Sequence, residues 1–259
     1  MKIPIYQIDA FTGEVFKGNP AAVCPLLDWP EDQVLQNIAA ENNLSETAFF
    51  VDKGDHFHLR WFTPTMEIDL CGHATLASAY VIFKYLDLDW DKIRFHTISG
   101  ELIITRDNDM ISMDFPAWKP EPTEIPDLLV TALKIKPEET YKSRDLIVLF
   151  PSEEDVVNLK PDFCELEKLD TLCTIVTAPG NQVDFVSRVF VPKAGIPEDP
   201  VTGSAHSSLI PFWAEKLGKS KMKAKQLSKR TGTLFCELHG DRVKISGKCA
   251  PYLIGEIEF

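Results

Sequence analysis

Two hydrophobic periods alternate along the chain and predict a mixture of strands and helices. In the segment 3–11, isoleucines alternate with polar neighbours, which is typical of a strand with one buried face. Over about 31–42 the apolar residues instead recur at helical spacing, behind a cap, a proline and acidic first-turn residues. The segment 74–86 is apolar on nearly every face, so this helix must be surrounded by protein.

Applied to the whole chain, the two periods predict a strand-rich α+β protein. Strands are expected at 3–11, 21–27, 44–51, 57–62, 93–96, 101–106, 111–115, 146–150, 174–178, 185–191, 226–228, 233–238, 243–246 and 250–259. Helices are expected at about 31–42, 74–86, 127–133, 153–159 and 204–217. In the last helix, Pro211 predicts a kink or a late start.

One sequence pattern occurs twice, about half the chain apart. Both copies begin with Arg-x-Phe-x-Pro, at 60–64 and 188–192. Each copy then runs through a short acidic segment to Gly-x-Ala, at 72–74 and 203–205, and on into a largely apolar run. This self-similarity predicts an internal duplication of a strand–loop–helix unit. The two halves would then form two similar lobes, which suits a curled sheet around a central helix in each.

The glycine of each copy, Gly72 or Gly203, falls where an extended segment gives way to a helical run. Backbone N–H groups in a first helical turn lack intrahelical acceptors, and the helix dipole adds to their attraction for an anion. A small carboxylate would suit such donors as well as a phosphate. A pseudo-two-fold axis between the copies would put both helix starts across one cleft.

A proline-rich segment divides the chain. Residues 115–126 contain four prolines in twelve positions, the composition of a domain linker. We therefore expect an N-terminal lobe over 1–117 and a C-terminal lobe from 118, with the active-site cleft between them.

Composition and charge exclude several function classes. The 259-residue chain has a formal net charge of −12, which argues against a nucleic-acid or anionic-membrane surface. No segment approaches the roughly 20 apolar residues that span a bilayer, and the N-terminus lacks the apolar core of a signal peptide. The six cysteines are scattered without a CxxC pair, so we expect reduced thiols in a cytoplasmic protein.

Glu46 is the leading candidate for proton transfer. It enters an apolar strand without a basic neighbour nearby in sequence, and a carboxylate there would have its charged form disfavoured. A solvent-facing or backbone-satisfied carboxylate is the alternative. Asp199 precedes Pro200, and an Asp-Pro turn explains it without any function.

The sequence also offers a thiol and several histidines. In the second copy of the repeat, Thr202 matches Cys71, so a symmetric two-cysteine epimerase is not expected. His73 and His206 flank the two glycines and could hydrogen-bond a substrate. Their spacing fits no familiar metal site, and Ser204 is not in the Gly-x-Ser-x-Gly setting of a hydrolase nucleophile. Arg60 and Arg188 are interpreted as strand-end ion-pair partners rather than ligand clamps.

Five motifs in order resemble one family. They are Gly18-Asn-Pro-Ala-Ala-Val23 behind Asp9-Ala-Phe11, Asn43-Leu-Ser-Glu-Thr-Ala48, Arg60-Trp-Phe-Thr-Pro64, Leu70-Cys-Gly-His-Ala-Thr75 and Glu198-Asp-Pro-Val-Thr-Gly-Ser-Ala-His206. Together they resemble the phenazine-biosynthesis-like (PhzF-type) isomerases, which share the diaminopimelate epimerase fold. That fold has two similar lobes, each a curled, mostly antiparallel sheet around a central helix. The resemblance also implies that the last strand, about 250–259, returns to the first lobe, so that the second lobe spans 118–249.

The resemblance further implies roles for individual residues. Glu46 would shuttle the proton during isomerisation of a cyclic dihydro-hydroxyanthranilate, without a metal or organic cofactor. His73, Asp199 and Ser204 would contact the substrate, and the Gly72–His73 and Gly203–Ser204 amides would hold its carboxylate. We expect Asn19, Ser45 and Cys71, which lie in the same motifs, to line the substrate site. A homodimer is also implied.

Two alternatives stay open at this point. The first is an amino-acid racemase or epimerase with Cys71 and a carboxylate, Glu46 or Asp199, as unlike bases. The second is a binding or interaction protein that kept the scaffold and lost catalysis. The thiol before Gly72 is shared with the epimerase branch and leaves the substrate open, and a phenazine pathway does not follow from the resemblance.

Overall fold

The computed structural model describes residues 2–86 and 90–259. Within them the chain forms two compact units: unit 1, with described residues 2–86, 90–114 and 246–259, and unit 2, with residues 115–245. The first boundary falls between Asp114 and Phe115, where the proline-rich segment begins.

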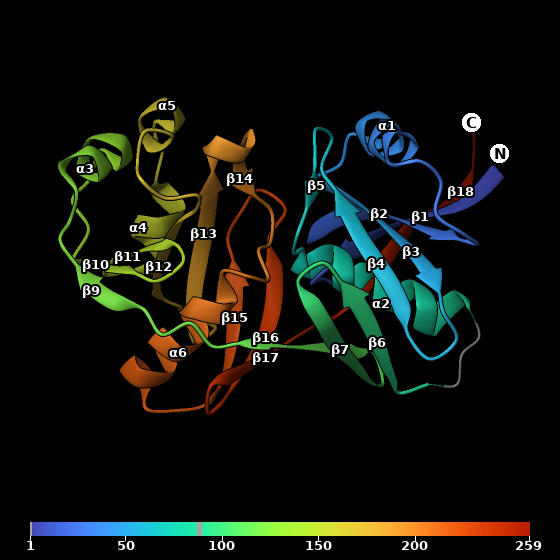
Figure 1. Ribbon diagram of the computed structural model, residues 1–259. Helices are drawn as coiled ribbons and strands as arrows, with labels where there is room; N and C mark the ends of the chain where they lie inside the picture. Colours follow the sequence, from blue (N-terminus) through green and yellow to red (C-terminus); the bar gives the residue numbers. More distant parts are fainter. Residues whose placement is uncertain (1, 87–89) are drawn as a thin grey trace. The chain divides into compact units, whose positions relative to one another are not determined.

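Unit 1 contains two helices and most of the long strands (Figure 1). Its strands are β1 (Lys2–Ala10), β2 (Asn19–Leu26), β3 (Glu46–Asp52), β4 (Phe57–Phe62), β5 (Glu67–Ile68), β6 (Lys92–Thr97), β7 (Gly100–Asp107), β8 (Met110–Pro116) and β18 (Cys249–Glu258). Its helices are α1 (Asp32–Asn42) and α2 (Gly72–Tyr85).

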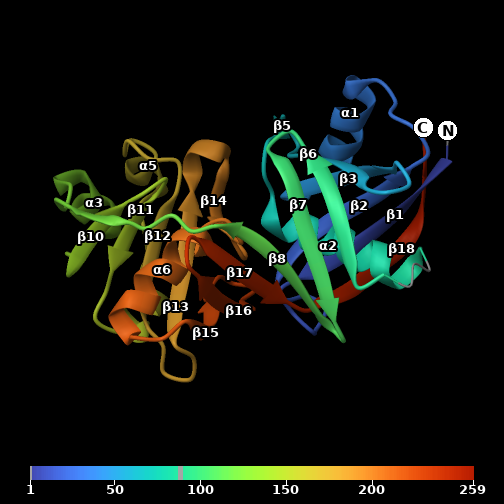
Figure 2. The same cartoon turned by 60° about the horizontal axis from the view of Figure 1, so that its bottom comes forward.

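These strands pair in the order β8-β7-β6-β4-β3-β2-β1-β18, and β5 pairs with β4. The β6–β4 and β3–β2 pairs are parallel, and the other pairs are antiparallel. The last strand of the chain, β18, lies along the first, as Figure 2 also shows. Unit 1 is therefore closed by the two ends of the chain.

Helix α2 is the centre of unit 1. Eleven of its fourteen residues are buried, and it packs against β1, β2, β3 and β18. Helix α1 covers another face of the sheet, where Leu35 and Ile38 join a core with Ile5, Cys24 and Phe49. An all-round apolar helix needs protein on every side, and the sheet supplies it.

Unit 2 repeats this plan with shorter elements (Figures 1 and 2). Its strands are β9 (Glu121–Thr123), β10 (Glu139–Lys142), β11 (Leu146–Leu149), β12 (Thr174–Pro179), β13 (Phe185–Val191), β14 (Ile196–Asp199), β15 (Lys221–Gln226), β16 (Gly232–His239) and β17 (Arg242–Gly247). Its helices are α3 (Asp127–Leu133), α4 (Glu153–Asn158), α5 (Phe163–Leu166), the 3₁₀ turn η1 (Pro192–Ala194) and α6 (His206–Leu217).

The strand order of unit 2 matches that of unit 1. Its strands pair as β16-β15-β13-β12-β11-β10-β9, with β14 on β13. The parallel pairs are β15–β13 and β12–β11, at the same places in the order as β6–β4 and β3–β2. Strand β13 thus corresponds to β4, β14 to β5 and α6 to α2. The predicted α+β class with two similar halves is confirmed.

The two arginines of the repeat form equivalent ion pairs in the two units. Arg60 donates from Nε and Nη2 to the Glu67 carboxylate at 2.7 Å each, across the β4–β5 pair. Arg188 donates to Glu198 at 2.7 and 3.0 Å across β13–β14. Both guanidinium groups are largely buried, so the interpretation as ion-pair partners is confirmed.

Helix α6 begins later than α2, and Pro211 lies inside it. The residues 203–205 form a turn before the helix starts at His206. Pro211 cannot donate to the carbonyl of Ser207, and that carbonyl instead accepts from the Trp118 N–H at 2.9 Å. The helix therefore continues through the proline to Leu217. The late start agrees with the sequence expectation.

The strand expected at 226–228 is wrong. The strand is β15, Lys221–Gln226, in which Met222, Ala224 and Gln226 point inward and lysines alternate with them. Lysine-rich strands resemble loops by composition, and only the alternation of burial reveals the strand. The short strands β5, β9, β10 and β14 and helix α5 were also not predicted, because two to four residues carry too little periodicity.

Among the described helices, none is both long and apolar enough to cross a membrane.

Removing the Arg188 side chain should strongly destabilise unit 2. Its Nη1 also donates to the carbonyls of Val156 and Leu159 at 3.0 and 2.9 Å, so Arg188→Ala leaves a carboxylate and two carbonyls unpaired. We expect a loss of about 3–5 kcal/mol in the free energy of unfolding, measured by urea denaturation. Lys2→Ala is the control, because its pair with Glu258 is mostly exposed, and it should cost less than about 1 kcal/mol. Equal losses in the two variants would contradict the assignment.

Candidate active site

Four of the predicted site residues meet in unit 1. Asn19 begins β2, Glu46 begins β3, and Cys71 and His73 flank the first residue of α2. The parallel register sets Ala21 beside Glu46, so the starts of β2 and β3 are neighbours. All four side chains are buried, with 9% of Glu46 exposed and none of Asn19.

The turn before β2 places Asn19. Gly18 has φ +65°, and a Cβ at this position would lie 2.1 Å from the Ala10 carbonyl oxygen. Only glycine is compatible with this close approach, because any side chain would push the turn away from β1. The Gly-Asn-Pro motif is therefore a structural requirement for the position of the asparagine.

His73 lies at the centre of the cluster and contacts the other three residues. Its Nε2 lies 3.0 Å from Oε2 of Glu46. On the other side of the ring, Nδ1 lies 3.1 Å from the Asn19 amide nitrogen and 3.5 Å from the Cys71 sulfur. The ring thus links a carboxylate to an amide and a thiol.

The charges in this cluster act on one another. Burial by itself lowers the pKa of His73, but the Glu46 carboxylate, together with the Cys71 sulfur once that is ionised, raises the pKa above its usual range. Burial, reinforced by the Glu46 carboxylate, raises the pKa of Cys71 to about 11. The protonated form of His73 is therefore favoured, and Cys71 is a thiol at neutral pH.

Asn19 can form a hydrogen bond with the His73 ring whether the ring is neutral or positively charged. An amide nitrogen only donates, so the contact with Nδ1 corresponds to a neutral ring whose proton is on Nε2, facing Glu46. When the ring gains its second proton, an amide turned by 180° offers its oxygen to Nδ1–H. The asparagine is thus a better partner than an aspartate for a histidine that gains and loses a proton.

The same atoms could be considered as metal ligands. Ligand atoms of Glu46, Cys71 and His73 all lie within 4.8 Å of one another. However, the ring offers Nε2 to Glu46 and Nδ1 to Cys71, whereas one ion binds one ring nitrogen. The geometry fits a carboxylate–histidine ion pair flanked by an amide and a thiol better than a metal site. That the enzyme works without a metal stays a prediction.

The first turn of α2 offers backbone donors next to this chain. Cys71 is the N-cap residue, and its side chain makes no capping hydrogen bond. The N–H groups of Gly72, His73 and Ala74 have no intrahelical acceptor. That the Gly72–His73 amides hold the carboxylate of a substrate, as the family resemblance implies, stays a prediction.

The remaining predicted residues belong elsewhere. Ser45 precedes Glu46 directly, while Asp199, Gly203 and Ser204 lie in unit 2. Asp199 ends β14, is 9% exposed and accepts a hydrogen bond from the Thr202 hydroxyl. That both groups of residues bind one substrate stays a prediction.

Gln226, which is not among the residues predicted from the sequence, holds the loop after Asp199. Its amide nitrogen donates to the carbonyl of Asp199 at 2.8 Å, and its Oε1 accepts from the Thr202 N–H at 2.9 Å. Gln226 is fully buried at the end of β15. The inward position of this glutamine would have been visible with the correct strand register.

His206 has a structural role. Its Nδ1–H donates to the Thr202 carbonyl at 2.8 Å, the ring is fully buried beside Phe185, and burial lowers its pKa to about 4. It is therefore a neutral core histidine and no counterpart of His73. The sequence suggestion that His206 could bind substrate is not supported by this environment.

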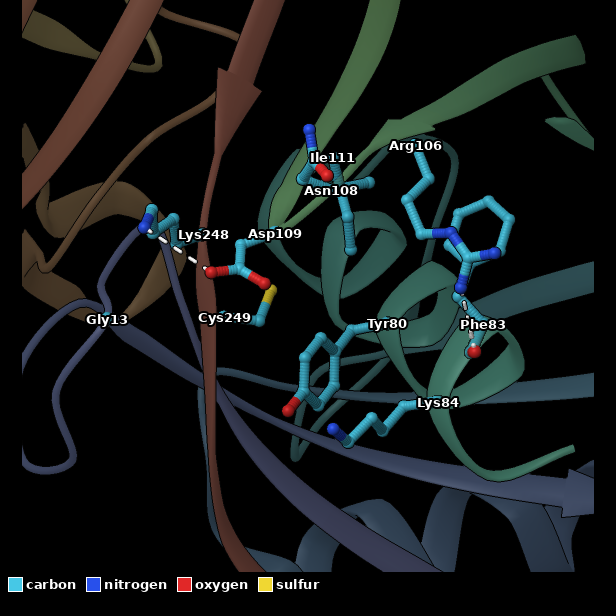
Figure 3. Close-up of a pocket in the computed structure, with 10 residues that line it drawn as sticks. All are labelled: Gly13, Tyr80, Phe83, Lys84, Arg106, Asn108, Asp109, Ile111, Lys248 and Cys249. Carbon is cyan, nitrogen blue, oxygen red and sulfur yellow. Dashed lines mark hydrogen bonds and ion pairs between the residues drawn. The ribbon is translucent and has the colours of Figure 1, made fainter. Parts of the chain in front are cut away.

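A cavity of about 400 Å³ lies farther along α2, and none of the predicted site residues lines it (Figure 3). Two of its cationic side chains, Arg106 and Lys248, have structural partners. Arg106 donates to the carbonyl of Phe83 at 3.1 Å near the end of α2, and Lys248 lies 3.7 Å from Asp109. The cluster around His73, which brings together four of the predicted residues, is therefore the candidate site.

Comparison with known proteins agrees with the fold and the motifs. The family model described as phenazine biosynthesis-like protein matches residues 8–255. An uncharacterized isomerase of Pseudomonas aeruginosa is 51% identical over 99% of both chains. A crystal structure of a PhzF family protein from Enterococcus faecalis is 48% identical, covers 100% of both chains and superposes with a TM-score of 0.98. A probable proline racemase from Agrobacterium radiobacter, 7% identical with a TM-score of 0.67 and covering 99% of this chain and 93% of its own, shares the fold alone.

The fold is the α+β fold shared by PhzF family proteins and by epimerase- and racemase-like proteins. Within that class, the chain belongs to the phenazine biosynthesis-like protein family. The expected enzyme class is confirmed, because three relatives at 44–51% identity are named isomerases.

Asn19→Asp should raise the pKa of His73 above its wild-type value. The new carboxylate can only accept a hydrogen bond from Nδ1–H, and its negative charge favours the imidazolium form. The measurement is a titration of the ring carbon signals of both buried histidines by NMR. His206 is the internal control and should be unchanged. A pKa of His73 that stays the same or falls would contradict the proposed partnership.

His206 should make the stability of unit 2 depend on pH. Its pKa is lowered by folding from the usual 6.5 to about 4, so the stability is fully present above pH 6.5 and is lost as the pH falls towards 4. From pH 7 to 4, the free energy of unfolding should fall by about 3 kcal/mol more in the wild type than in His206→Gln. Urea denaturation at several pH values measures this. A constant difference between the two proteins would show that His206 does not titrate in this way.

Proposed function

We propose that this protein is a cofactor-independent isomerase that moves a proton within a small carboxylate substrate. The observation that supports this most is the 3.0 Å contact between the buried Glu46 carboxylate and Nε2 of His73. A carboxylate beside a histidine that retains a proton can accept a proton from carbon and release it again. Burial keeps water from competing for that proton.

In the proposed reaction Glu46 removes a proton from a carbon next to an activating group. The electron pair of that C–H bond enters the conjugated system, and a π pair shifts towards a second carbon. Glu46 then returns the proton to the second carbon, while His73 stabilises the carboxylate. Nothing is oxidised or reduced, so no redox partner is needed.

The substrate carboxylate is proposed to bind at the first turn of α2. The free N–H groups around Gly72 and His73 and the helix dipole favour an anion there. This local attraction is needed because the chain as a whole carries a net charge of −12. Asn19, Ser45 and Cys71 would line the same part of the site, and Gly203, Ser204 and Asp199 are the proposed contacts from unit 2.

The family name directs the choice of test substrate. The resemblance points to a cyclic dihydro-hydroxyanthranilate, which has a carboxylate, a ring double bond and an acidic C–H bond. We propose a compound of this class, without assigning the chain to a phenazine pathway. A cytoplasmic homodimer is the proposed state of the protein.

A racemase or epimerase is the second candidate, since Cys71 lies 3.5 Å from Nδ1 of His73. This reaction would need Cys71 as a thiolate base. Burial and Glu46 raise the pKa of the thiol to about 11, so the thiolate is scarce at neutral pH. The isomerase reaction with Glu46 as the base is therefore favoured.

Replacing Glu46 should abolish proton transfer. Wild type and Glu46→Gln would be incubated in D₂O with dihydro-hydroxyanthranilate and a panel of unsaturated and amino carboxylic acids. By NMR, we expect deuterium incorporation by the wild type and a loss of at least about 100-fold in the variant. Glu101→Gln, on the surface of β7, is the matched control and should keep full activity.

The position of the label decides between the two candidates. Deuterium at a new carbon, with Cys71→Ala still active, is the isomerase result. Inversion at one carbon with loss of activity in Cys71→Ala is the racemase result. Full turnover by Glu46→Gln would refute the proposed mechanism.

A further inference from the structure

Because the fold is duplicated, unit 2 has a residue that corresponds to Glu46. The pairing of the strands identifies it. Phe62 and Phe190 hold the same position in the two Arg-x-Phe repeats. Phe62 pairs across the sheet with Thr47, and Phe190 pairs with Thr174. The two threonines therefore correspond, and both are buried.

The residue before each threonine follows from this register. In unit 1 it is Glu46, and in unit 2 it is Cys173. A thiol in unit 2 thus occupies the position of the proposed base in unit 1. Matching the motifs by sequence does not find this cysteine, because the similarity between the two halves does not extend to residues 43–48 and 170–175.

The residue beside this position on the neighbouring parallel strand also differs between the two units. In unit 1, β2 sets Ala22 beside Thr47 and Ala21 beside Glu46. In unit 2, β11 sets Leu146 beside Thr174, so Asp145 corresponds to Ala21 (Figure 1 shows β11 beside β12). The Leu146 N–H donates to the Cys173 carbonyl at 3.1 Å and holds these two strand starts together.

Asp145 is an unusual residue for this position. Only 3% of it is exposed, and its Oδ1 has no hydrogen-bond partner among the described residues. Burial raises the pKa of the carboxyl group, although Arg144 and the backbone and side chain of Cys173 oppose this. Buried carboxylates without an ion pair are costly, so such a residue calls for an explanation beyond packing.

Cys173 responds to the charges around it. Burial raises the pKa of its thiol, Asp145 raises it further, and Arg144 lowers it in part. Asp199 also raises it, so Cys173 lies within electrostatic reach of a predicted substrate-binding residue in the same unit. The side chain is partly exposed, which leaves it accessible to a small molecule.

We propose that Cys173 is a substrate-contacting residue of unit 2, the counterpart of Glu46, and that Asp145, beside it on the neighbouring parallel strand, is its positioning residue. The position that carries a base in unit 1 then carries a hydrogen-bonding group without charge in unit 2. Proton transfer is left to Glu46 alone, which suits an isomerase that returns the proton it removed. The inference rests on the proposed function.

The role of Asp145 is tested by thiol alkylation, which needs no substrate. Wild type and Asp145→Asn react with iodoacetamide between pH 7 and 11, and mass spectrometry follows each cysteine. Losing the negative charge should move the labelling profile of Cys173 at least one pH unit lower, while the exposed Cys164 stays unchanged. Identical profiles for Cys173 in both proteins would overturn the role of Asp145. If Asp145→Asn does not fold, Asp145→Ala, which restores the residue type of unit 1, replaces it.

The substrate contact is tested by kinetics with dihydro-hydroxyanthranilate. Cys173→Ala should raise KM at least 10-fold with kcat changed less than 3-fold, and Cys173→Ser should recover most of the loss. Glu46→Gln in the same assay should lose kcat. Wild-type KM in Cys173→Ala, beside an inactive Glu46→Gln, would overturn the inference and leave the proposed function intact. An active Glu46→Gln would instead refute the proposed function.

Discussion

The burial of helix α2 on all sides is the constraint on which unit 1 depends. A helix that is apolar all round cannot rest on one face of a flat sheet, so strands from both ends of the chain enclose it. Its first turn begins with Gly72 directly after Cys71. The packing that satisfies the helix is therefore also what brings His73 to the starts of β2 and β3.

The two units share one scaffold, but the residues at the starts of their corresponding strands differ. Both units keep the same strand order and the same buried arginine–glutamate pair, because these features hold a strand, a short hairpin strand and a helix in place. The residues at the starts of the corresponding strands have diverged. Unit 1 has Glu46 beside a small alanine, and unit 2 has Cys173 beside Asp145.

The sequence identified most of the residues of the candidate site but not their connections. Glu46, His73, Cys71 and Asn19 were all expected at the site. Their contacts could not be predicted, since the four residues are spread over 55 positions and meet only through the parallel register of β2 with β3 and the packing of α2 against both strands. The same limit explains why Gln226 was missed and why His206 looked like a ligand.

The sequence by itself determined the fold class, the internal duplication and the family, because hydrophobic periods and ordered motifs are properties of the chain. It also predicted that helix 74–86 is enclosed, since its composition allows nothing else. Only the tertiary structure decided that Glu46 touches His73, that His206 is a core residue and that Cys173 occupies the place of Glu46 in unit 2. Contacts between strands depend on register, and register is set by packing over the whole sheet rather than by local sequence.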